Sequence, residues 1–320
     1  PDHERRTLRA SLTAGCPHDD PGAVEPAPAP AARWTIGEPD QVLEMLEEHD
    51  VPATGLVPYV YAILPHVFSE DTWVSAIEIS PDHPEVVHHA NLGFARVGER
   101  VTDDNFLTGR VPGGDAMTLP EGTAVLIPRG SVIGLQIHYS TTGRPVTSKL
   151  SVGLRFPRSP VQKRLYFECI SNRRFAIPPL APAHEVRAER RIDHDAIGIG
   201  MFAHMHVRGR DMSFIAHRPD GSRERMLLIP NYNFDWQQSY QWREGEAKFP
   251  AGTRFEVVAH YDNSRFNPFN PDPDATIRHG QQTEDEMMYG FVFYLRADEQ
   301  LNLDVDPRTG HVRPAKTLAE

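Results

Sequence analysis

The sequence predicts an all-β protein built from antiparallel sheets. Short segments rich in β-branched and aromatic residues recur along most of the chain, as is typical of strands. Pro, Gly or Asp bounds these segments, and the 320 residues include 29 Pro and 23 Gly, which favour turns. No long helical pattern alternates with the strands. Antiparallel sandwiches or jelly rolls are therefore favoured over a parallel α/β sheet.

The first 33 residues differ from the rest of the chain. Leu8 and Leu12 are four residues apart in "RRTLRASL" (5–12) and predict a short helix. The stretch "PGAVEPAPAPAAR" (21–33) is a Pro/Ala linker, which we expect to be extended and semi-rigid. We interpret residues 1–33 as an N-terminal tail and linker. The chain begins at Pro1 without a signal-peptide pattern, so we expect a processed or trimmed start.

Two groups of strands follow, separated by a basic, Pro-containing segment. Residues 39–50 fit a helix or a strand equally well. Strands of the first group are predicted at 57–65, 72–80, 123–128, 131–140 and 149–156. "RFPRSPVQKR" (155–164) has little apolar content, and we place a boundary there between domains at 34–157 and 158–320. Strands of the second group are predicted at 164–170, 196–207, 211–219, 225–230, 253–262 and 286–295.

Composition excludes several classes of protein. The net charge is −11 with no basic block, which argues against nucleic-acid binding. No apolar run reaches the roughly 18–20 residues of a membrane span. Cys16 and Cys169 lie far apart, which excludes a cysteine-built zinc site and a c-type haem within this chain. Whether these two cysteines pair is left open by the sequence.

The segment "AHMHVRGRDM" (203–212) is the first candidate metal site. On a strand, His204 and His206 project from one face while Met205 points away. The preceding apolar run predicts a strand buried on both faces, and buried imidazoles need partners. A metal would satisfy both rings. Two polar residues on a solvated face remain the alternative.

Three further histidines lie in the first group of strands. His88 and His89 are adjacent in "VVHHANLGFAR" (86–96), so a regular strand would turn them to opposite faces. They can reach one metal only through a bulge or through different ring nitrogens. His138 lies in the apolar strand "GLQIHYS" (134–140), where a hydrogen-bonded core histidine is the alternative.

Met287 suggests the identity of the metal. In "TEDEMMYGFVFYL" (283–295), acidic residues precede two methionines and an aromatic strand. Core packing is the ordinary role of such methionines. A thioether beside two imidazoles, however, favours copper, especially Cu(I), over zinc, magnesium or calcium. We interpret 284–286 as a solvated turn rather than a hard-cation site. We expect no metal ligand among the histidines in other contexts, which are His66, His83, His194, His217, His260 and His279.

Four segments in this order resemble one family: "VHHANLGF", "LQIHYSTTG", "HMHVRGRDM" and "DEMMYGFVFY". The set resembles the copper type II, ascorbate-dependent monooxygenases, the peptidylglycine α-hydroxylating and dopamine β-monooxygenase family, over roughly residues 34–300. It looks most like a bacterial-type member. The resemblance implies two antiparallel, jelly-roll-like β-sandwich domains that face each other across a cleft, with one copper in each. In some bacterial members another redox domain precedes the pair, so an upstream redox domain fits this resemblance.

The resemblance also implies roles for individual residues. His88, His89 and His138 would hold the electron-transfer copper. His204, His206 and Met287 would hold the catalytic, oxygen-binding copper. The implied reaction hydroxylates an aliphatic C–H bond of a small-molecule substrate with O₂ and two electrons from ascorbate or a similar reductant. The family also implies a periplasmic or extracellular location.

The match departs from the peptide-amidating enzyme at the substrate. That enzyme has an Arg two residues before its His-x-His, and here the position holds Phe202. The family positions two and four residues after the ligand methionine hold Tyr289 and Phe291 instead of Asn and Tyr. We therefore expect a less polar substrate, bound by these three aromatic residues.

Two other interpretations stay open. A cupin-like enzyme with a single Fe, Mn or Zn fits the Gly-x₅-His-x-His start at Gly198, although Arg210 and Asp211 occupy the positions where cupins place a Glu. A non-catalytic copper-binding or electron-transfer protein could share the two-copper fold.

Overall fold

The computed structural model describes residues 2–14, 33–99, 101–102 and 105–314. The chain divides into two compact units, Pro1–Arg33 and Trp34–Glu320. Helix α1 (Asp2–Thr13) lies in the first unit and confirms the helix predicted there. Cys16 falls outside the described residues, and Cys169 is buried. The predicted all-β class is confirmed, because every other long element is a strand.

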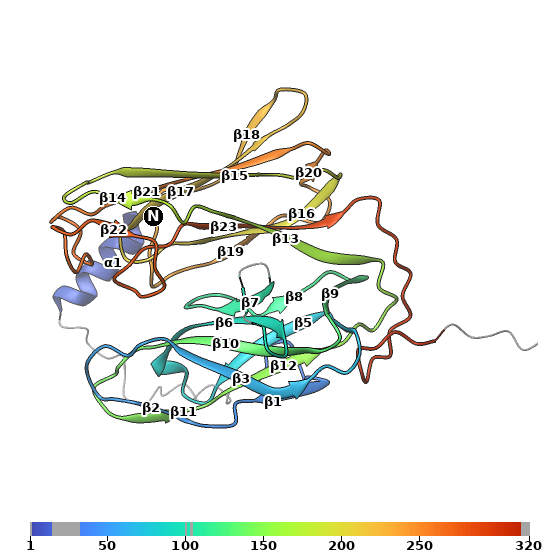
Figure 1. Cartoon of the computed structure of the whole chain (residues 1–320). Helices are drawn as coiled ribbons and strands as arrows, with labels where there is room; N and C mark the ends of the chain where they lie inside the picture. The colour runs from blue at the N-terminus through green and yellow to red at the C-terminus, as the bar shows by residue number, and fades with distance from the viewer. Residues whose placement is uncertain (1, 15–32, 100, 103–104, 315–320) are drawn as a thin grey trace, which may run out of the picture. The chain divides into compact units, whose positions relative to one another are not determined.

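The N-terminal half, residues 34–157, packs two four-stranded antiparallel sheets around one core (Figure 1). One sheet has the order β1 (Gln41–Glu44), β12 (Leu150–Arg155), β5 (Ala76–Pro81) and β8 (Met117–Thr118). The other has the order β3 (Val60–Val67), β10 (Ser131–Tyr139), β6 (Val87–Arg96) and β7 (Phe106–Arg110). β2 (His49–Val51) pairs with β11 (Val146–Ser148), and a 3₁₀ turn, η1 (Pro84–Val86), leads into β6. Residues 39–50, ambiguous by sequence, thus contribute strands.

The C-terminal half, residues 158–320, packs a four-stranded sheet on a seven-stranded one. The four-stranded sheet has the order β15 (His184–Arg191), β21 (Arg254–Tyr261), β17 (Gly209–His217) and β18 (Arg223–Ile229). In the larger sheet, β19 (Ser239–Gln241), β16 (Ala196–His204), β23 (Tyr289–Arg296) and β13 (Lys163–Ser171) are neighbours in that order. β20 (Lys248–Phe249) pairs with β16, and β14 (Ala176–Ile177) pairs with β22 (Ile277–Arg278).

The larger sheet crosses the proposed boundary between the halves. β9 (Thr123–Ile127) pairs in parallel with β13, and β4 (Thr72–Val74) pairs with β9. Leu165 and Leu295 of the C-terminal half are members of the N-terminal core cluster. Backbone hydrogen bonds and apolar contacts therefore join the halves, and the domain boundary at 157/158 stays a prediction.

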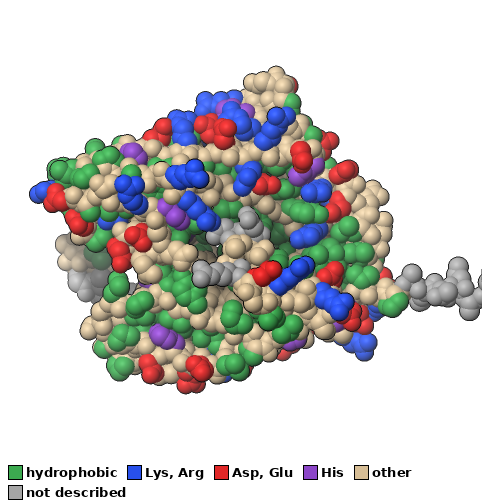
Figure 2. Space-filling model, viewed as in Figure 1, with side chains coloured by type: hydrophobic (Ala, Val, Ile, Leu, Met, Phe, Trp, Pro, Cys, Tyr) green, Lys and Arg blue, Asp and Glu red, His purple; other side chains and the backbone are tan. Residues whose placement is uncertain are grey.

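One face of the molecule carries charges of both signs. On the face that Figure 2 shows, Lys and Arg side chains are interspersed with Asp and Glu rather than gathered in one basic patch.

In the part of the chain that the structure describes, no helix is both long and apolar enough to cross a membrane.

Candidate metal centre

The first histidine group lies on two paired strands of the N-terminal half. His89 of β6 is directly opposite His138 of β10, and the register then shifts so that Val87 is opposite Tyr139. His88 is the extra residue of this β-bulge, as adjacent histidines sharing one site require. One ring nitrogen from each of His88, His89 and His138 lies within 4.8 Å of the others. The structure thus brings together all three predicted ligands.

The ring nitrogens of His88 and His89 have hydrogen-bond partners, whereas one nitrogen of His138 has none among the described residues. Nε2 of His88 lies 2.8 Å from Oδ1 of Asp235, and Nε2 of His89 lies 3.2 Å from the Tyr59 hydroxyl. Nδ1 of His88 and Nδ1 of His89 face each other at 3.1 Å. Nδ1 of His138 is buried and has no hydrogen-bond partner among the described residues. A cation bound by the three imidazoles would satisfy this orphaned atom.

The second group lies where β16 ends and where β23 begins, in the C-terminal half. His204 is the last residue of β16, and Met287 precedes β23 by two residues. His206 was predicted to lie on this strand, but β16 ends at His204 and His206 follows in a loop. The ring centroid of His206 is still 5.3 Å from that of His204. All three side chains line one cavity. The prediction that they share a site is therefore compatible with the structure.

Hydrogen bonds also orient the imidazole rings of the second group. Nδ1 of His204 lies 2.8 Å from Oε1 of Gln237, and Nδ1 of His206 lies 3.2 Å from the carbonyl oxygen of Asp285. Nε2 of His206 is buried without a hydrogen-bond partner among the described residues. Since each Nδ1 donates to an oxygen, the lone pair of each ring is on Nε2.

Three of these imidazoles are held neutral. Burial and the neighbouring imidazoles lower the pKa of His206 to about 3. Burial, followed by His88, lowers the pKa of His138 to about 4. Burial and the surrounding histidines bring the pKa of His89 well below its usual range. Neutral imidazole is the form that binds a metal ion, so His89, His138 and His206 can act as ligands at neutral pH.

The Glu286 side chain holds the backbone at the second group through hydrogen bonds. Its carboxylate accepts backbone N–H bonds from His206 at 2.9 Å, Arg208 at 2.7 Å and Met287 at 3.2 Å. Burial raises the pKa of Glu286 to about 8, against these donors and the Arg208 guanidinium, which lower it. The prediction of a solvated turn at 284–286 is wrong for Glu286, which is fully buried. One side chain ties the His-x-His segment to the methionine.

The two groups lie close together. The ring centroids of His89 and His204 are 6.2 Å apart. His89, His204, His206 and Met287 all line a cavity of about 650 Å³, the size of a small-molecule site. This cavity, here called the chamber, is therefore bordered by His89 from the N-terminal group and by His204, His206 and Met287 from the C-terminal group.

Aromatic side chains form much of the chamber wall. Phe202, Tyr289 and Phe291, predicted to bind substrate, all line it. A second cavity of about 370 Å³ shares Phe106 and Phe202 with the first and extends to Phe293. Phe106 of the N-terminal half lies 5.1 Å from Phe291, ring centroid to ring centroid. A substrate would meet apolar ring faces beside the two histidine groups.

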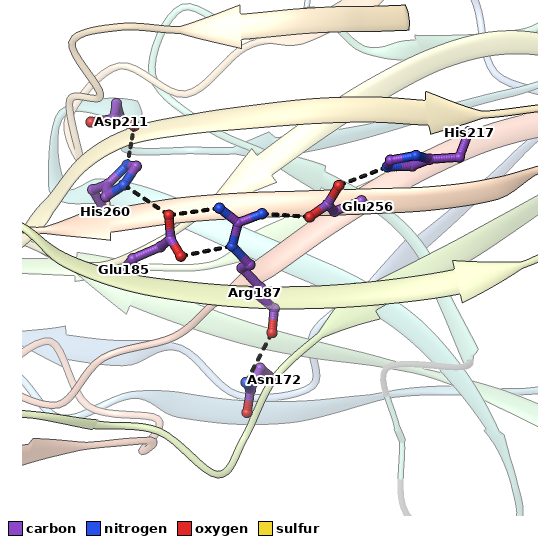
Figure 3. A network of polar contacts seen from close by, with 7 residues as sticks. All are labelled: Asn172, Glu185, Arg187, Asp211, His217, Glu256 and His260. Atoms are coloured by element: carbon purple, nitrogen blue, oxygen red, sulfur yellow. Dashed lines mark hydrogen bonds and ion pairs between the residues drawn. The ribbon is translucent and has the colours of Figure 1, made fainter. Parts of the chain in front are cut away.

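Several histidines outside the two groups have polar partners. On the sheet β15-β21-β17, Arg187 joins Glu185 to Glu256, and these carboxylates contact His260 and His217 (Figure 3). His260 also lies 2.7 Å from Asp211. His66 contacts Gln41, His83 contacts Glu85 and His194 contacts Asp193. The ring of His279 lies 6.1 Å from that of Tyr289, close to the second group.

The acidic ligand of a cupin-like site is not found here. Asp211, at one of the positions where cupins place a Glu, bonds His260 instead. Within the described ranges, the only set of three His, Cys, Asp or Glu residues with converging ligand atoms is His88, His89 and His138. No carboxylate therefore completes a three-ligand set with His204 and His206 in this part of the chain.

The segment 232–237 also contributes to the site and was not predicted from the sequence. Asp235 and Gln237 each bond a histidine, and the Phe234 ring stacks on His88 at 5.0 Å and an interplanar angle of 22°. Asp235 is 147 residues from His88 in the chain, so no local pattern links them. The one signal for this segment in the sequence was a cluster of polar and aromatic residues in a loop bounded by Pro.

Comparisons with known proteins add no assignment. No family model and no curated protein matches the chain. The infectious bursal disease virus Gx strain structure matches at 7% identity, over 85% of this chain and 74% of that chain, with a TM-score of 0.23. Procruciferin, an 11S globulin from Brassica napus, matches at 9% identity, over 82% and 84% of the respective chains, with a TM-score of 0.14. Similarity at this level carries no argument about fold or function.

Proposed function

We propose that this chain is a copper-dependent monooxygenase that hydroxylates an aliphatic C–H bond of an apolar small molecule. One observation carries the proposal: His89 of the three-imidazole group borders the same chamber as all three members of the two-imidazole, one-thioether group. Thioether with imidazole is a ligand set that suits copper. The orphaned Nδ1 of His138 and Nε2 of His206 fit a bound metal in each group.

In this proposal His88, His89 and His138 hold one copper, and His204, His206 and Met287 hold the other. Bound copper would supply the one-electron and dioxygen chemistry that side chains lack. One oxygen atom of O₂ enters the C–H bond and the other leaves as water, with two protons and two electrons from ascorbate or a similar reductant. A periplasmic or extracellular location remains a prediction from the family resemblance.

The protein's own residues would bind and orient the substrate. Phe202, Tyr289 and Phe291 present apolar faces beside the second histidine group, and burial of apolar surface would hold the substrate there. Hydrogen bonds that Nδ1 of His204 donates to Gln237 and Nδ1 of His206 donates to the Asp285 carbonyl orient these two rings. The aromatic side chains would keep water away from the side of the substrate that they cover.

Ascorbate-dependent O₂ consumption tests this function. The copper-loaded protein is incubated with ascorbate and a panel of alkylbenzenes, and oxygen uptake and hydroxylated products are measured. We expect substrate-dependent uptake with one hydroxylated product per O₂, lost in Met287→Ala. Copper that ascorbate reduces without any product across the panel would instead favour a non-catalytic electron-transfer protein.

A further inference from the structure

One short segment of the C-terminal half contacts both histidine groups. Residues 231–238, here called the strap, bring Asp235 to His88 and Gln237 to His204, each at 2.8 Å. The Phe234 ring stacks on His88 and lies 6.0 Å from His89 and 5.9 Å from His206, measured between ring centroids. The strap is thus in contact with rings from both halves.

The strap is anchored at its start. The Tyr232 hydroxyl donates to the carbonyl of Met205 at 2.6 Å and accepts from the N–H of Met205 at 3.0 Å. Gly209 permits this approach, because a Cβ there would lie 2.7 Å from Cδ1 of Tyr232. Tyr232 therefore fixes the strap to the residue between His204 and His206.

The strap is also ordered internally. Oδ1 of the Asn233 side chain accepts a hydrogen bond from the N–H of Asp235 at 2.8 Å. The backbone carbonyl of Asn233 accepts one from the N–H of Trp236 at 3.1 Å. Nε2 of Gln237 donates to the carbonyl of Phe234 at 2.9 Å. Asp235 and Gln237 are therefore held by one turn rather than placed independently.

These bonds determine which ring nitrogen carries the proton. The Asp235 carboxylate can only accept, so Nε2 of His88 carries the hydrogen and Nδ1 is bare. The amide nitrogen of Gln237 is committed to Phe234, so its oxygen faces His204. Nδ1 of His204 must then donate, and Nε2 is bare. On His88 the bare Nδ1 faces Nδ1 of His89 at 3.1 Å, within the three-histidine group. On His204 the bare Nε2 is the nitrogen that Gln237 does not contact.

We propose that the strap positions one histidine of each group, Asp235 acting on His88 and Gln237 on His204, and that Phe234 links the two groups mechanically. The effect on copper binding rests on the proposed function, whereas the effect on the tautomers does not. Partners that orient a ligand imidazole in this way typically raise metal affinity by about 10–100-fold.

Nitrogen-15 NMR of the metal-free protein tests the tautomer assignment. In the wild type we expect a bare Nδ1 on His88 and a bare Nε2 on His204. Asp235→Ala should give mixed tautomers at His88 and leave His204 unchanged, and Gln237→Ala should do the reverse. Phe234→Ala should shift the resonances of both rings. Tautomers that stay unchanged in Asp235→Ala and Gln237→Ala would overturn the proposal.

Conservative and neighbouring variants separate positioning from folding. Asp235→Asn and Gln237→Glu keep an acceptor oxygen and should restore the wild-type tautomers. Gln238→Ala, the adjacent glutamine that lines the second cavity, should leave both rings unchanged. If Gln238→Ala perturbs the rings as strongly as Gln237→Ala, the effect is general loosening and the proposal fails.

Copper affinity separates this proposal from the proposed function. Competition with a chromophoric Cu(I) chelator should show about 10–100-fold weaker binding in Asp235→Ala and Gln237→Ala, and near-normal binding in the conservative variants. A wild type that binds no copper, but whose tautomers follow the strap, would refute the proposed function alone. A wild type that binds copper with equal affinity in all variants would refute the positioning role alone.

Discussion

At the scale of single residues, the ligand candidates could be predicted because each lies in a recognisable local pattern. His88, His89 and His138 converge, and His204, His206 and Met287 line one chamber. The bulge required by adjacent histidines is present at His88. These residues lie on or next to buried strands. Regular alternation does not set all their directions, because His88 is in a bulge and His206 and Met287 lie just outside β16 and β23.

The residues that support the ligands could not be predicted in the same way. Gln237 and Asp235 lie in a loop, and loop geometry does not follow from period-two spacing. Glu286 resembles its exposed neighbour Glu284 in sequence, yet it is fully buried beneath the His-x-His segment. Its burial depends on three backbone N–H groups that only the folded chain brings together.

The first prediction concerns Glu286→Leu. The substitution leaves three buried backbone N–H groups without their acceptor, and each unsatisfied donor costs about 1–3 kcal/mol. We expect the free energy of unfolding of the metal-free protein to fall by at least about 3 kcal/mol in urea denaturation. Glu284→Leu, at the exposed neighbouring position, should change it by less than about 1 kcal/mol. Equal stability of the two variants would contradict the role given to Glu286.

At the scale of elements, alternation along β23 explains the chamber wall. Tyr289 and Phe291 are two residues apart and face the first cavity, and Phe293 continues the row into the second. The sequence predicted this strand and its aromatic content. The contact of Phe106 on β7 with Phe291 on β23 joins distant strands and needed the structure.

The second prediction concerns Phe202→Arg. A guanidinium in the aromatic wall is poorly solvated there and opposes an apolar substrate. We expect KM for the best alkylbenzene to rise at least about 10-fold while the copper content stays unchanged, as measured by steady-state oxygen uptake and metal analysis. Phe202→Leu is the control and should retain most of the affinity. An unchanged KM in Phe202→Arg would exclude Phe202 from the substrate site.

At the scale of the whole molecule, two sandwiches were predicted and the sheets fit that class. The pairing of β9 with β13 was not predicted, because a parallel pairing between segments about 40 residues apart leaves no local signal. Leu165 and Leu295 also complete the N-terminal core. The halves are therefore expected to depend on each other for stability.

The third prediction follows from this shared sheet. A fragment of residues 34–157 loses the strand that pairs with β9 and the side chains that complete its core. We expect it to lack a cooperative thermal transition by circular dichroism, whereas residues 34–320 unfold cooperatively. A sharp transition in the short fragment would show that the N-terminal half is an independent domain.

The copper content of the wild type and of Met287→Ala tests the central claim most directly. The account predicts two coppers per chain in the wild type, falling toward one in Met287→Ala, with the larger loss of affinity in the reduced state because a thioether favours Cu(I). The Cu(II) EPR spectrum should retain the signal of the three-imidazole group. Met288→Ala, at the buried neighbour outside the chamber, should keep both coppers. Zinc or iron at one per chain, or unchanged copper binding in Met287→Ala, would contradict the account.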